Sequence, residues 1–502
     1  MLILTPPFSS HSDLKAWGLK TSVDPFINRD DELQELHDIL KYNKNVVITG
    51  PVGVGKSETA RKYCDTFSSE YERVVWIDGV DDFEGNIFAL LKQLDIMLPD
   101  ALQSTIGIQN AMSDAYEKLT LVNTLLVYDN IEMNETLFRF LPKHGLTYPD
   151  LRILMTSQDP RWPSHVVSYP LLPLKLINAF TYLAYNIYDD GSINQKEIKH
   201  FLERNIGRHP LLCRLSAAYV KKHQMTVRQY KELLEDAIHD LSPGDYPVTK
   251  DAKFAAHIHA AVMLAVRAME RSNCTTAVHL LKTLSHMDIG NMETKLLRYF
   301  KGDKGAYPEQ LLATLAEYAL ITARSPVGTD TTTTTTTTTY SSSSSGDTSY
   351  TMYAYVRQVL QMNMPEATTT KCIQDLSSMV SSSRTPGTRH LVPLIKKHAQ
   401  SNDILQILKI HKNTIRLALE NEGAYVCAKE VVGCFFMHEL KYEFKAGESF
   451  MNKYKYGRAL EVFEDVLKNQ TNHLGPHHPE TLKTLKAIED CKRKTRILGD
   501  DE

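Results

Sequence analysis

The sequence predicts a multidomain protein of the α/β plus α class, and three observations carry this prediction. Short apolar runs rich in β-branched residues alternate with amphipathic segments up to about Pro170. A glycine-rich loop separates the first of these runs from a helical segment. Beyond residue 170, strand-like runs nearly vanish, and Leu, Ala and Tyr recur at the three- and four-residue spacing of helices. We therefore expect a parallel sheet covered by helices, followed by helical domains.

Length and composition exclude several classes of protein. The chain has 502 residues, which suits three or four domains, and its formal net charge of −3 excludes an overall basic nucleic-acid binder. Its seven cysteines include no C-x-x-C pair, so neither a disulfide framework nor a zinc ribbon is indicated. No apolar stretch approaches the roughly 20 residues that span a bilayer. The N-terminus also lacks the features of a signal peptide, so we expect a cytoplasmic protein without membrane contact.

Four apolar runs define the expected sheet. They occupy residues 46–49, 74–77, 124–128 and 153–156, and their four- or five-residue length favours buried strands over helices. The intervals between them suit crossover helices, which predicts a parallel sheet within residues 26–170. Residues 1–25 are rich in Pro and Ser, and we interpret them as a leader.

One motif directly follows the first of these strands. It matches G-x-x-x-x-G-K-[ST] and reads Gly50-Pro51-Val52-Gly53-Val54-Gly55-Lys56-Ser57. The backbone N–H groups of such a loop point at phosphate oxygens, and the N-terminus of the following helix adds partial positive charge. Lys56 is expected to reach the β- and γ-phosphates, and the Ser57 hydroxyl to bind Mg²⁺. The loop, with the adjoining Glu58, predicts a site for ADP or ATP.

The strand at 124–128 is followed directly by a carboxylate, Asp129, that could bind the Mg²⁺ ion. Asp129 is expected to hold Mg²⁺ directly or through water. An acid at the next position would polarise the attacking water, but Asn130 stands there, and an amide cannot accept the proton. Glu132, two residues on, is an alternative base. With Asp129 and Asn130 as the candidate catalytic positions, we expect nucleotide binding with at most slow ATP hydrolysis.

With these motifs in order, residues 24–365 resemble the NB-ARC branch of the STAND signal-transduction NTPases, in the form joined to kinesin-light-chain-like TPR repeats. The segment Asp24–Leu33 resembles the stretch that precedes the family's P-loop, and the resemblance implies that Arg29 packs by the nucleotide. The segment Leu154–Gln158 is similar to the family's sensor strand, with Gln158 in place of an Arg that touches the γ-phosphate.

Two further positions take part in this resemblance. The segment Gly207–Leu212 is similar to the family's G-L-P-L-A motif, which implies that Pro210 packs on the adenine. The segment Tyr350–Val356 aligns with the family's M-H-D element, whose His holds the ADP β-phosphate in the closed state. Tyr353 replaces that His, and a phenol does not titrate like an imidazole near neutral pH. The resemblance therefore implies a weakened ADP lock.

The same resemblance divides the chain into domains. A P-loop parallel α/β/α sheet at 26–170 is followed by a helical lid at 171–245 and a winged-helix-like domain at 246–365. Residues 366–502 are expected to be C-terminal α-helices with a TPR-like unit at 453–491.

Two regions have expectations of their own. A Thr/Ser tract within 325–349 cannot bury apolar surface, so we expect a disordered insert there, in the loop of a β-hairpin formed by residues 319–324 and 350–356. In the TPR-like unit, the first helix is expected to bury a face, and the second carries apolar residues at three-residue spacing. The first set is Tyr456, Leu460, Phe463 and Leu467, and the second is Leu482, Leu485 and Ile488.

These features predict an ADP/ATP-binding signal-transduction switch that opens and forms oligomers in response to nucleotide. Its protein partners are expected at the TPR-like helices, in a pathway resembling innate immunity or apoptosis. One alternative is a non-hydrolysing scaffold that keeps nucleotide as a structural cofactor. The other is an AAA-type ATPase with a DNA-facing winged helix, which the absence of a dominant basic stripe in residues 250–365 argues against.

Overall fold

A computed structural model describes most of the chain. The described residues are 16–19, 26–43, 45–79, 83–96, 105–134, 137, 139–142, 148–187, 194–242, 244–247, 254–287, 292–300, 307–324, 349–382, 391–398, 401–421, 425–474, 476 and 478–499. They fall into two compact units. Unit 1 comprises Met1–His390 and Asn421–Ala424, and unit 2 comprises Leu391–Glu420 and Tyr425–Glu502. No described helix is both long and apolar enough to cross a membrane.

Unit 1 begins with a six-stranded sheet in which every pair of neighbouring strands is parallel. The spatial order is β1-β3-β4-β5-β2-β6. The strands are β1 (Ala16–Trp17), β2 (Asn45–Thr49), β3 (Arg73–Asp78), β4 (Thr124–Asp129), β5 (Leu151–Ser157) and β6 (Val167–Pro170). All four predicted strands are confirmed, as β2, β3, β4 and β5. Nearly all their residues are buried because helices cover both faces of the sheet.

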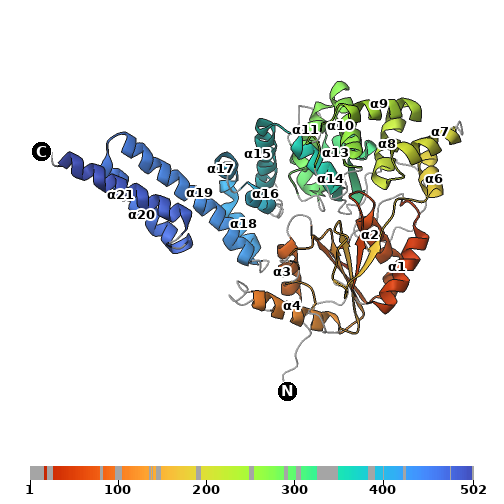
Figure 1. The fold of residues 1–502 in the computed structure, drawn as a ribbon, viewed down its shortest axis with the longest axis horizontal. Helices are drawn as coiled ribbons and strands as arrows, with labels where there is room; N and C mark the ends of the chain where they lie inside the picture. Colours follow the sequence, from red (N-terminus) through yellow and green to blue (C-terminus); the bar gives the residue numbers. More distant parts are fainter. Residues whose placement is uncertain are drawn as a thin grey trace, which may run out of the picture. The chain divides into compact units, whose positions relative to one another are not determined.

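These helices pack in two layers (Figure 1). They are α1 (Asp30–Tyr42), α2 (Lys56–Phe67), α3 (Phe83–Gln93) and α4 (Thr105–Leu119), with a short 3₁₀ turn at Ser68–Glu70. Helices α1 and α2 lie on one face, and α3 and α4 lie on the other. Leu36 of α1, Tyr63 of α2 and Val127 of β4 are fully buried in the core between the first pair and the sheet. Burial of this kind stabilises the fold by about 25 cal/mol for each Å² of apolar surface.

The sheet is wider than the sequence predicts at both edges. Ala16 and Trp17 form β1 beside β3, within the segment that we interpreted as a leader. Leu19, which follows them, is buried in the core. At the other edge, β6 pairs with β2, where we expected the domain only to end. Neither strand carries a sequence signal, because one has two residues and the other alternates half-buried with exposed positions.

Four helices and one π-helical turn follow the sheet. They are α6 (Leu176–Ile187), α7 (Gln195–His200), the π-helical turn Phe201–Asn205, α8 (Pro210–His223) and α9 (Val227–His239). Helix α8 begins with Pro210 at its first turn, where a missing N–H costs nothing. Helix α9 begins with a capping box between Thr226 and Gln229, which satisfies two backbone N–H groups at its start.

A second, antiparallel sheet lies among the remaining helices of unit 1. Its order is β7-β9-β8, from β7 (Met292–Glu293), β8 (Ile321–Arg324) and β9 (Ser349–Met352). The helices are α10 (Ala255–Arg271), α11 (Thr275–Leu284), α12 (Thr294–Leu297), α13 (Pro308–Glu317), α14 (Ala354–Met362) and α15 (Glu366–Ser382). The predicted hairpin is confirmed, because β8 pairs with β9 from Ile321 opposite Met352 to Arg324 opposite Ser349, but residues 354–356, predicted as part of its second strand, begin α14 instead. Of the predicted disordered insert at 325–349, Ser349 belongs to β9, and residues 325–348 lie outside the described residues.

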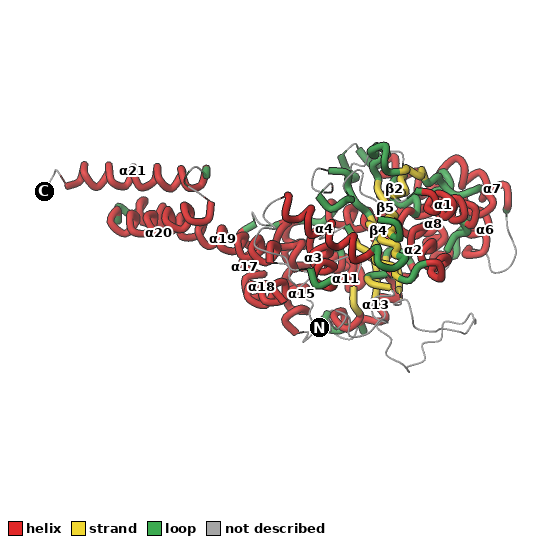
Figure 2. The backbone as a smooth tube through the Cα atoms, turned by 90° about the horizontal axis from the view of Figure 1, so that it is seen from below, coloured by secondary structure: helices red, strands yellow, loops and turns green. Residues whose placement is uncertain are grey.

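Unit 2 is helical throughout its described residues (Figure 2). Its helices are α16 (Leu391–Lys397), α17 (Asn402–Leu408), a 3₁₀ turn at Lys409–His411, α18 (Lys412–Asn421), α19 (Tyr425–Asn452), α20 (Tyr456–Leu474) and α21 (Pro479–Gly499). The prediction for the first helix of the TPR-like unit is confirmed, because Phe463 is buried and Tyr456, Leu460 and Leu467 pack against its cluster.

The second helix, α21, carries the apolar residues predicted at three-residue spacing, but they do not share one buried face. Ile488 is buried, but Leu482 and Leu485 are 49% and 39% exposed. The inward face of α21 instead carries Thr481 and Thr484, both fully buried. Thr484 can occupy such a position because its hydroxyl donates to the carbonyl oxygen of Glu480 in the preceding turn.

Candidate nucleotide site

The glycine-rich loop joins the end of β2 to the start of α2, as the motif requires. Gly53 and Gly55 have φ angles of 73° and 100°, in the left-handed region that favours glycine. A Cβ atom on Gly53 would lie 2.8 Å from Cε1 of His209, so side chains from α8's start also exclude any larger residue there. At Gly55 nothing lies within 4 Å of such an atom, so the loop keeps open space beside the helix N-terminus.

The Lys56 side chain forms hydrogen bonds with the backbone of this loop. Its Nζ donates to the carbonyl oxygens of Gly50 and Pro51, each at 2.9 Å. Burial lowers the pKa of Lys56 to about 8, although Asp129 opposes this shift by favouring the charged form. An ammonium group that is desolvated in this way gains from a phosphate group placed beside it. Ser57, the next residue, is half-buried in the first turn of α2.

Asp129 lies two strands away from β2, at the carboxyl end of β4, with β5 between them. Its side chain is almost completely buried and accepts a 2.6 Å hydrogen bond from the Thr156 hydroxyl. The same hydroxyl oxygen accepts the backbone N–H of Asn130 at 2.7 Å, which holds Asn130 at a positive φ of 56°. Asp129 is therefore fixed in orientation before any ligand arrives.

Residues from several segments meet at one cavity beside the loop. Its lining includes six of the predicted site residues, namely Arg29, Gly53, Gly55, Glu58, Pro210 and Tyr353. Phe26, Leu174 and Leu211 add apolar surface, which suits a flat aromatic base. The lining does not include the predicted residues Lys56, Ser57, Asp129, Asn130 and Gln158, the last of which follows the end of β5. The segments that carry Arg29, Pro210 and Tyr353 therefore meet beside Gly53 and Gly55 of the loop.

The Arg29 side chain forms hydrogen bonds with backbone carbonyl groups. Its guanidinium donates to the carbonyl oxygen of Val54 at 2.9 Å and to that of Leu172 at 3.0 Å, and the residue is only 2% exposed. Burial lowers the pKa of Arg29, and the nearby Glu32 opposes that shift. Arg29 thus ties the glycine-rich loop to the segment after β6.

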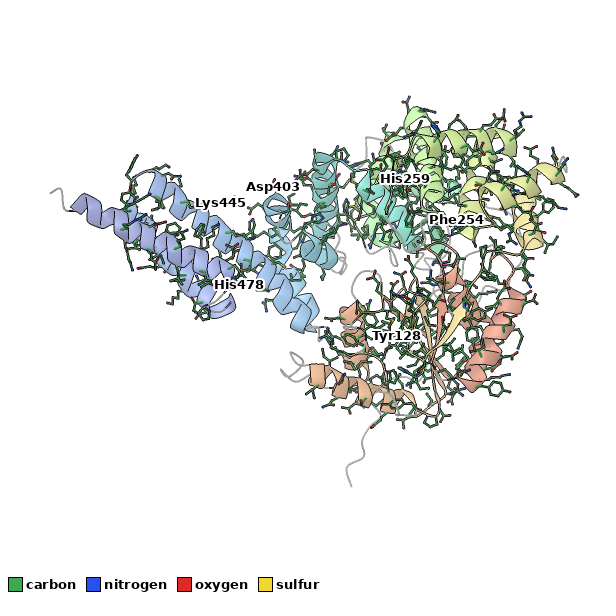
Figure 3. All side chains as sticks on the ribbon, in the orientation of Figure 1. Tyr128, Phe254, His259, Asp403, Lys445 and His478 are labelled. Atoms are coloured by element: carbon green, nitrogen blue, oxygen red, sulfur yellow. The ribbon has the colours of Figure 1, made fainter. Side chains whose placement is uncertain are left out.

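His209, Phe254 and Arg214 also take part in this site, and the sequence did not predict a role for any of them. The His209 ring donates from Nε2 to the carbonyl oxygen of Val52 at 2.8 Å. The same ring packs against that of Phe254, with 4.9 Å between ring centroids, and Phe254 is labelled in Figure 3. Arg214 of α8 lines the cavity together with Tyr353 and Tyr182. His209 directly precedes Pro210, and this proximity in sequence is the one signal that could have found it.

A buried ion pair connects the second sheet to the P-loop helix. Arg324, at the end of β8, donates from Nη1 to Glu58 at 3.3 Å and makes a second, shorter contact through Nη2. The side chains are 4% and 15% exposed. Glu58 directly follows Ser57, so this pair reaches the first turn of α2. It joins residues that are more than 260 positions apart in sequence.

The donor set fits a nucleotide phosphate with Mg²⁺. Within the described residues, no group of three or more His, Cys, Asp or Glu side chains could hold a metal by itself. Mg²⁺ in nucleotide sites takes one or two protein ligands, together with phosphate oxygens and water. Ser57 and Asp129 would supply those protein ligands, and the open loop beside Gly55 would receive the phosphates.

Sequence comparison agrees with this geometry. Residues 29–122 match the family model described as Novel STAND NTPase 3. A probable disease resistance protein of Arabidopsis thaliana is 31% identical over 161 residues, which are 30% of this chain. The matched region spans only 18% of the length of that relative.

Two solved structures resemble the chain more distantly. One is a STAND protein with a tetratricopeptide repeat sensor from Pyrococcus horikoshii, 14% identical with a TM-score of 0.47, covering 95% of this chain and 72% of that chain. The other is a Walker-type ATPase of Pyrococcus abyssi, 14% identical with a TM-score of 0.31, covering 68% of this chain and 98% of that chain. Residues 29–122, which hold the glycine-rich loop with β2 and β3 of the parallel sheet, are therefore similar to the nucleotide-binding domain of the STAND NTPases.

Proposed function

We propose that this protein is a conformational switch controlled by ADP and ATP. One observation carries the proposal, namely that a single cavity is lined by the glycine-rich loop, by Pro210 at the start of α8 and by Tyr353 directly before α14. A nucleotide in this cavity contacts three segments that are otherwise separate in sequence. Any difference between ADP and ATP in these contacts shifts the balance between conformations of unit 1.

The residues of the site have distinct tasks in this proposal. Backbone N–H groups of the loop and the Lys56 ammonium bind phosphate oxygens, while Ser57 and Asp129 hold Mg²⁺. The apolar surface near Pro210 receives the base. When bound, Mg²⁺ neutralises phosphate charge. Asn130 cannot take a proton from water, so we propose slow turnover or none, and a rate of several per second would contradict this.

In this proposal the change of nucleotide opens unit 1 and leads to oligomerisation. The helices of unit 2 contact protein partners. We place the switch in the cytoplasm, in a pathway of the innate-immunity or apoptosis type. The similarity to a probable disease resistance protein supports the choice of pathway.

The test compares Lys56→Ala with Lys41→Ala, a change to an exposed lysine on α1 of the same domain. We expect Lys56→Ala to lose ADP binding in isothermal titration calorimetry, and Lys41→Ala to bind like the wild type. Tight ADP binding by Lys56→Ala refutes the site. The mass of the wild type in light scattering with ADP and with ATP then separates a switch from a static scaffold, because only a switch changes its mass.

A further inference from the structure

Arg61 lies one helical turn after Ser57 on α2, and its side chain reaches the metal-binding carboxylate. Its Nη2 atom is 3.5 Å from Oδ2 of Asp129, and its Nη1 atom is 3.8 Å from Oε1 of Glu58. The guanidinium also stacks on Trp76 of β3, with 4.4 Å from its carbon to the ring centroid. The Arg61 side chain is 10% exposed, so the group is held among these neighbours rather than in water.

Both oxygens of Asp129 therefore have partners within the protein. Oδ1 accepts the hydrogen bond from Thr156, and Oδ2 faces the Arg61 guanidinium. A carboxylate with one strongly desolvated cation beside it is largely neutralised already. Mg²⁺ would have to share Oδ2 with Arg61 and would place two further positive charges a few ångströms from the guanidinium.

The flat guanidinium is suited to this position. It is permanently charged, it stacks on the indole ring, and it is less strongly hydrated than an ammonium group, which eases its burial. Asp129, Glu58 and Asp78 are carboxylates whose charges favour the charged form of Arg61, and Asp129 also favours the charged form of Lys56. The site thus contains its own cation before any metal enters.

We propose that Arg61 takes the place of the divalent cation at Asp129 when the bound nucleotide is a diphosphate, so that ADP binds without Mg²⁺ and the metal at Ser57 and Asp129 is needed only beside ATP. The proposal rests on the nucleotide site described under the proposed function and sets its metal requirement. Arg61 acts as a positioning residue, because it neutralises Asp129 and keeps that carboxylate from repelling the diphosphate.

The experiment measures ADP affinity by isothermal titration calorimetry on the full chain, once with Mg²⁺ and once with excess EDTA. For the wild type we expect the two dissociation constants to agree within about threefold. Arg61→Met keeps the length of the side chain and removes its charge, so we expect ADP to bind at least about tenfold more weakly in EDTA than in Mg²⁺. Arg61→Lys should restore a ratio close to that of the wild type.

Arg139→Met is the matched control, because Arg139 pairs with Glu84 in the same domain, and its ratio should equal that of the wild type. A second readout titrates Mn²⁺ into the ADP complex and follows its electron paramagnetic resonance signal. Arg61→Met should bind Mn²⁺ more tightly than the wild type, because Asp129 has lost its competing cation.

Three results would overturn the proposal. The first is a wild type that loses ADP affinity tenfold or more in EDTA, which decides the matter even where Arg61→Met fails to fold. The second is an Arg61→Met variant with the same ratio and the same Mn²⁺ affinity as the wild type. Both results leave ADP binding itself intact. The third, a wild type that binds no ADP in either condition, removes the proposed function as well.

Discussion

Breaking the ion pair between Arg324 and Glu58 tests how the second sheet is held to the P-loop helix. We choose Arg324→Met, which keeps most of the apolar stem and removes the charge. Glu58 is then left in a site where its side chain is 15% exposed. Loss of one partner of a buried ion pair costs about 3–5 kcal/mol, mainly because the other charge stays buried without it.

For Arg324→Met we expect a loss of stability smaller than this range. Glu58 keeps Arg61 at 3.8 Å, and its partial exposure allows some hydration. We therefore expect a loss of about 2–3 kcal/mol, which corresponds to a factor of roughly 30–150 in the opening equilibrium. The exposed pair of Arg298 and Glu309 provides the comparison, because Arg298→Met should change stability by less than about 1 kcal/mol.

Hydrogen exchange read by mass spectrometry is the assay, because the peptides of β8, β9 and α2 report local opening without requiring two-state unfolding. Arg324→Met and Glu58→Gln should each speed exchange there, and the double variant should add little to either. The interaction energy from this double-mutant cycle should exceed about 1 kcal/mol. Strictly additive effects, or exchange no faster than in Arg298→Met, would refute the structural role of the pair.

Two other predictions concern the glycine-rich loop. Lys56 has a pKa lowered to about 8, and a bound diphosphate favours its charged form. The affinity for ADP should therefore be constant below pH 8 and fall as the pH rises through 8. At pH 8 binding should take up about half a proton, which calorimetry in buffers of different ionisation enthalpy measures. An affinity that is flat from pH 7 to 9 would contradict that pKa. Gly53→Ala should weaken ADP binding at least about tenfold and destabilise the loop by about 1–2 kcal/mol, because φ is 73° and the new methyl group meets the His209 ring at 2.8 Å. His209→Ala in the same chain should recover the part of this loss due to the imidazole, but not the parts due to φ and to Leu211, whose side-chain atoms lie 3.0 and 3.1 Å from the new methyl group. Full recovery, or none, would contradict this division of causes.

The parts of the fold that follow from local pattern were predictable from the sequence. The four central strands are short apolar runs, and the glycine-rich loop has a spacing that only a strand-loop-helix unit explains. The hairpin of β8 and β9 was also predictable, although the Thr/Ser tract separates its strands. In each case the residues that decide the structure are neighbours in sequence or lie on one face of one element.

The rest depends on long-range packing. Arg61 and Arg324 look like ordinary charged residues on a helix and a strand, and their importance appears only when Asp129 and Glu58 are placed beside them. The burial of residues along α21 depends on packing in the same way, because Thr481 and Thr484 are fully buried there while Leu482 is 49% exposed. Periodicity identifies that a helix has an apolar stripe but not its exact angle.

The pairing of Arg324 with Ser349 has a consequence for the evolution of this chain. The Thr/Ser repeat lies in the sequence between Arg324 and Ser349, which face each other across the hairpin. The free energy of joining two fixed ends rises only with the logarithm of the number of residues between them, by about 0.6 kcal/mol for each doubling. Copying errors that lengthen or shorten the repeat therefore cost the hairpin little. We therefore expect a change of repeat length to leave Arg324 opposite Ser349 and in contact with Glu58 of α2.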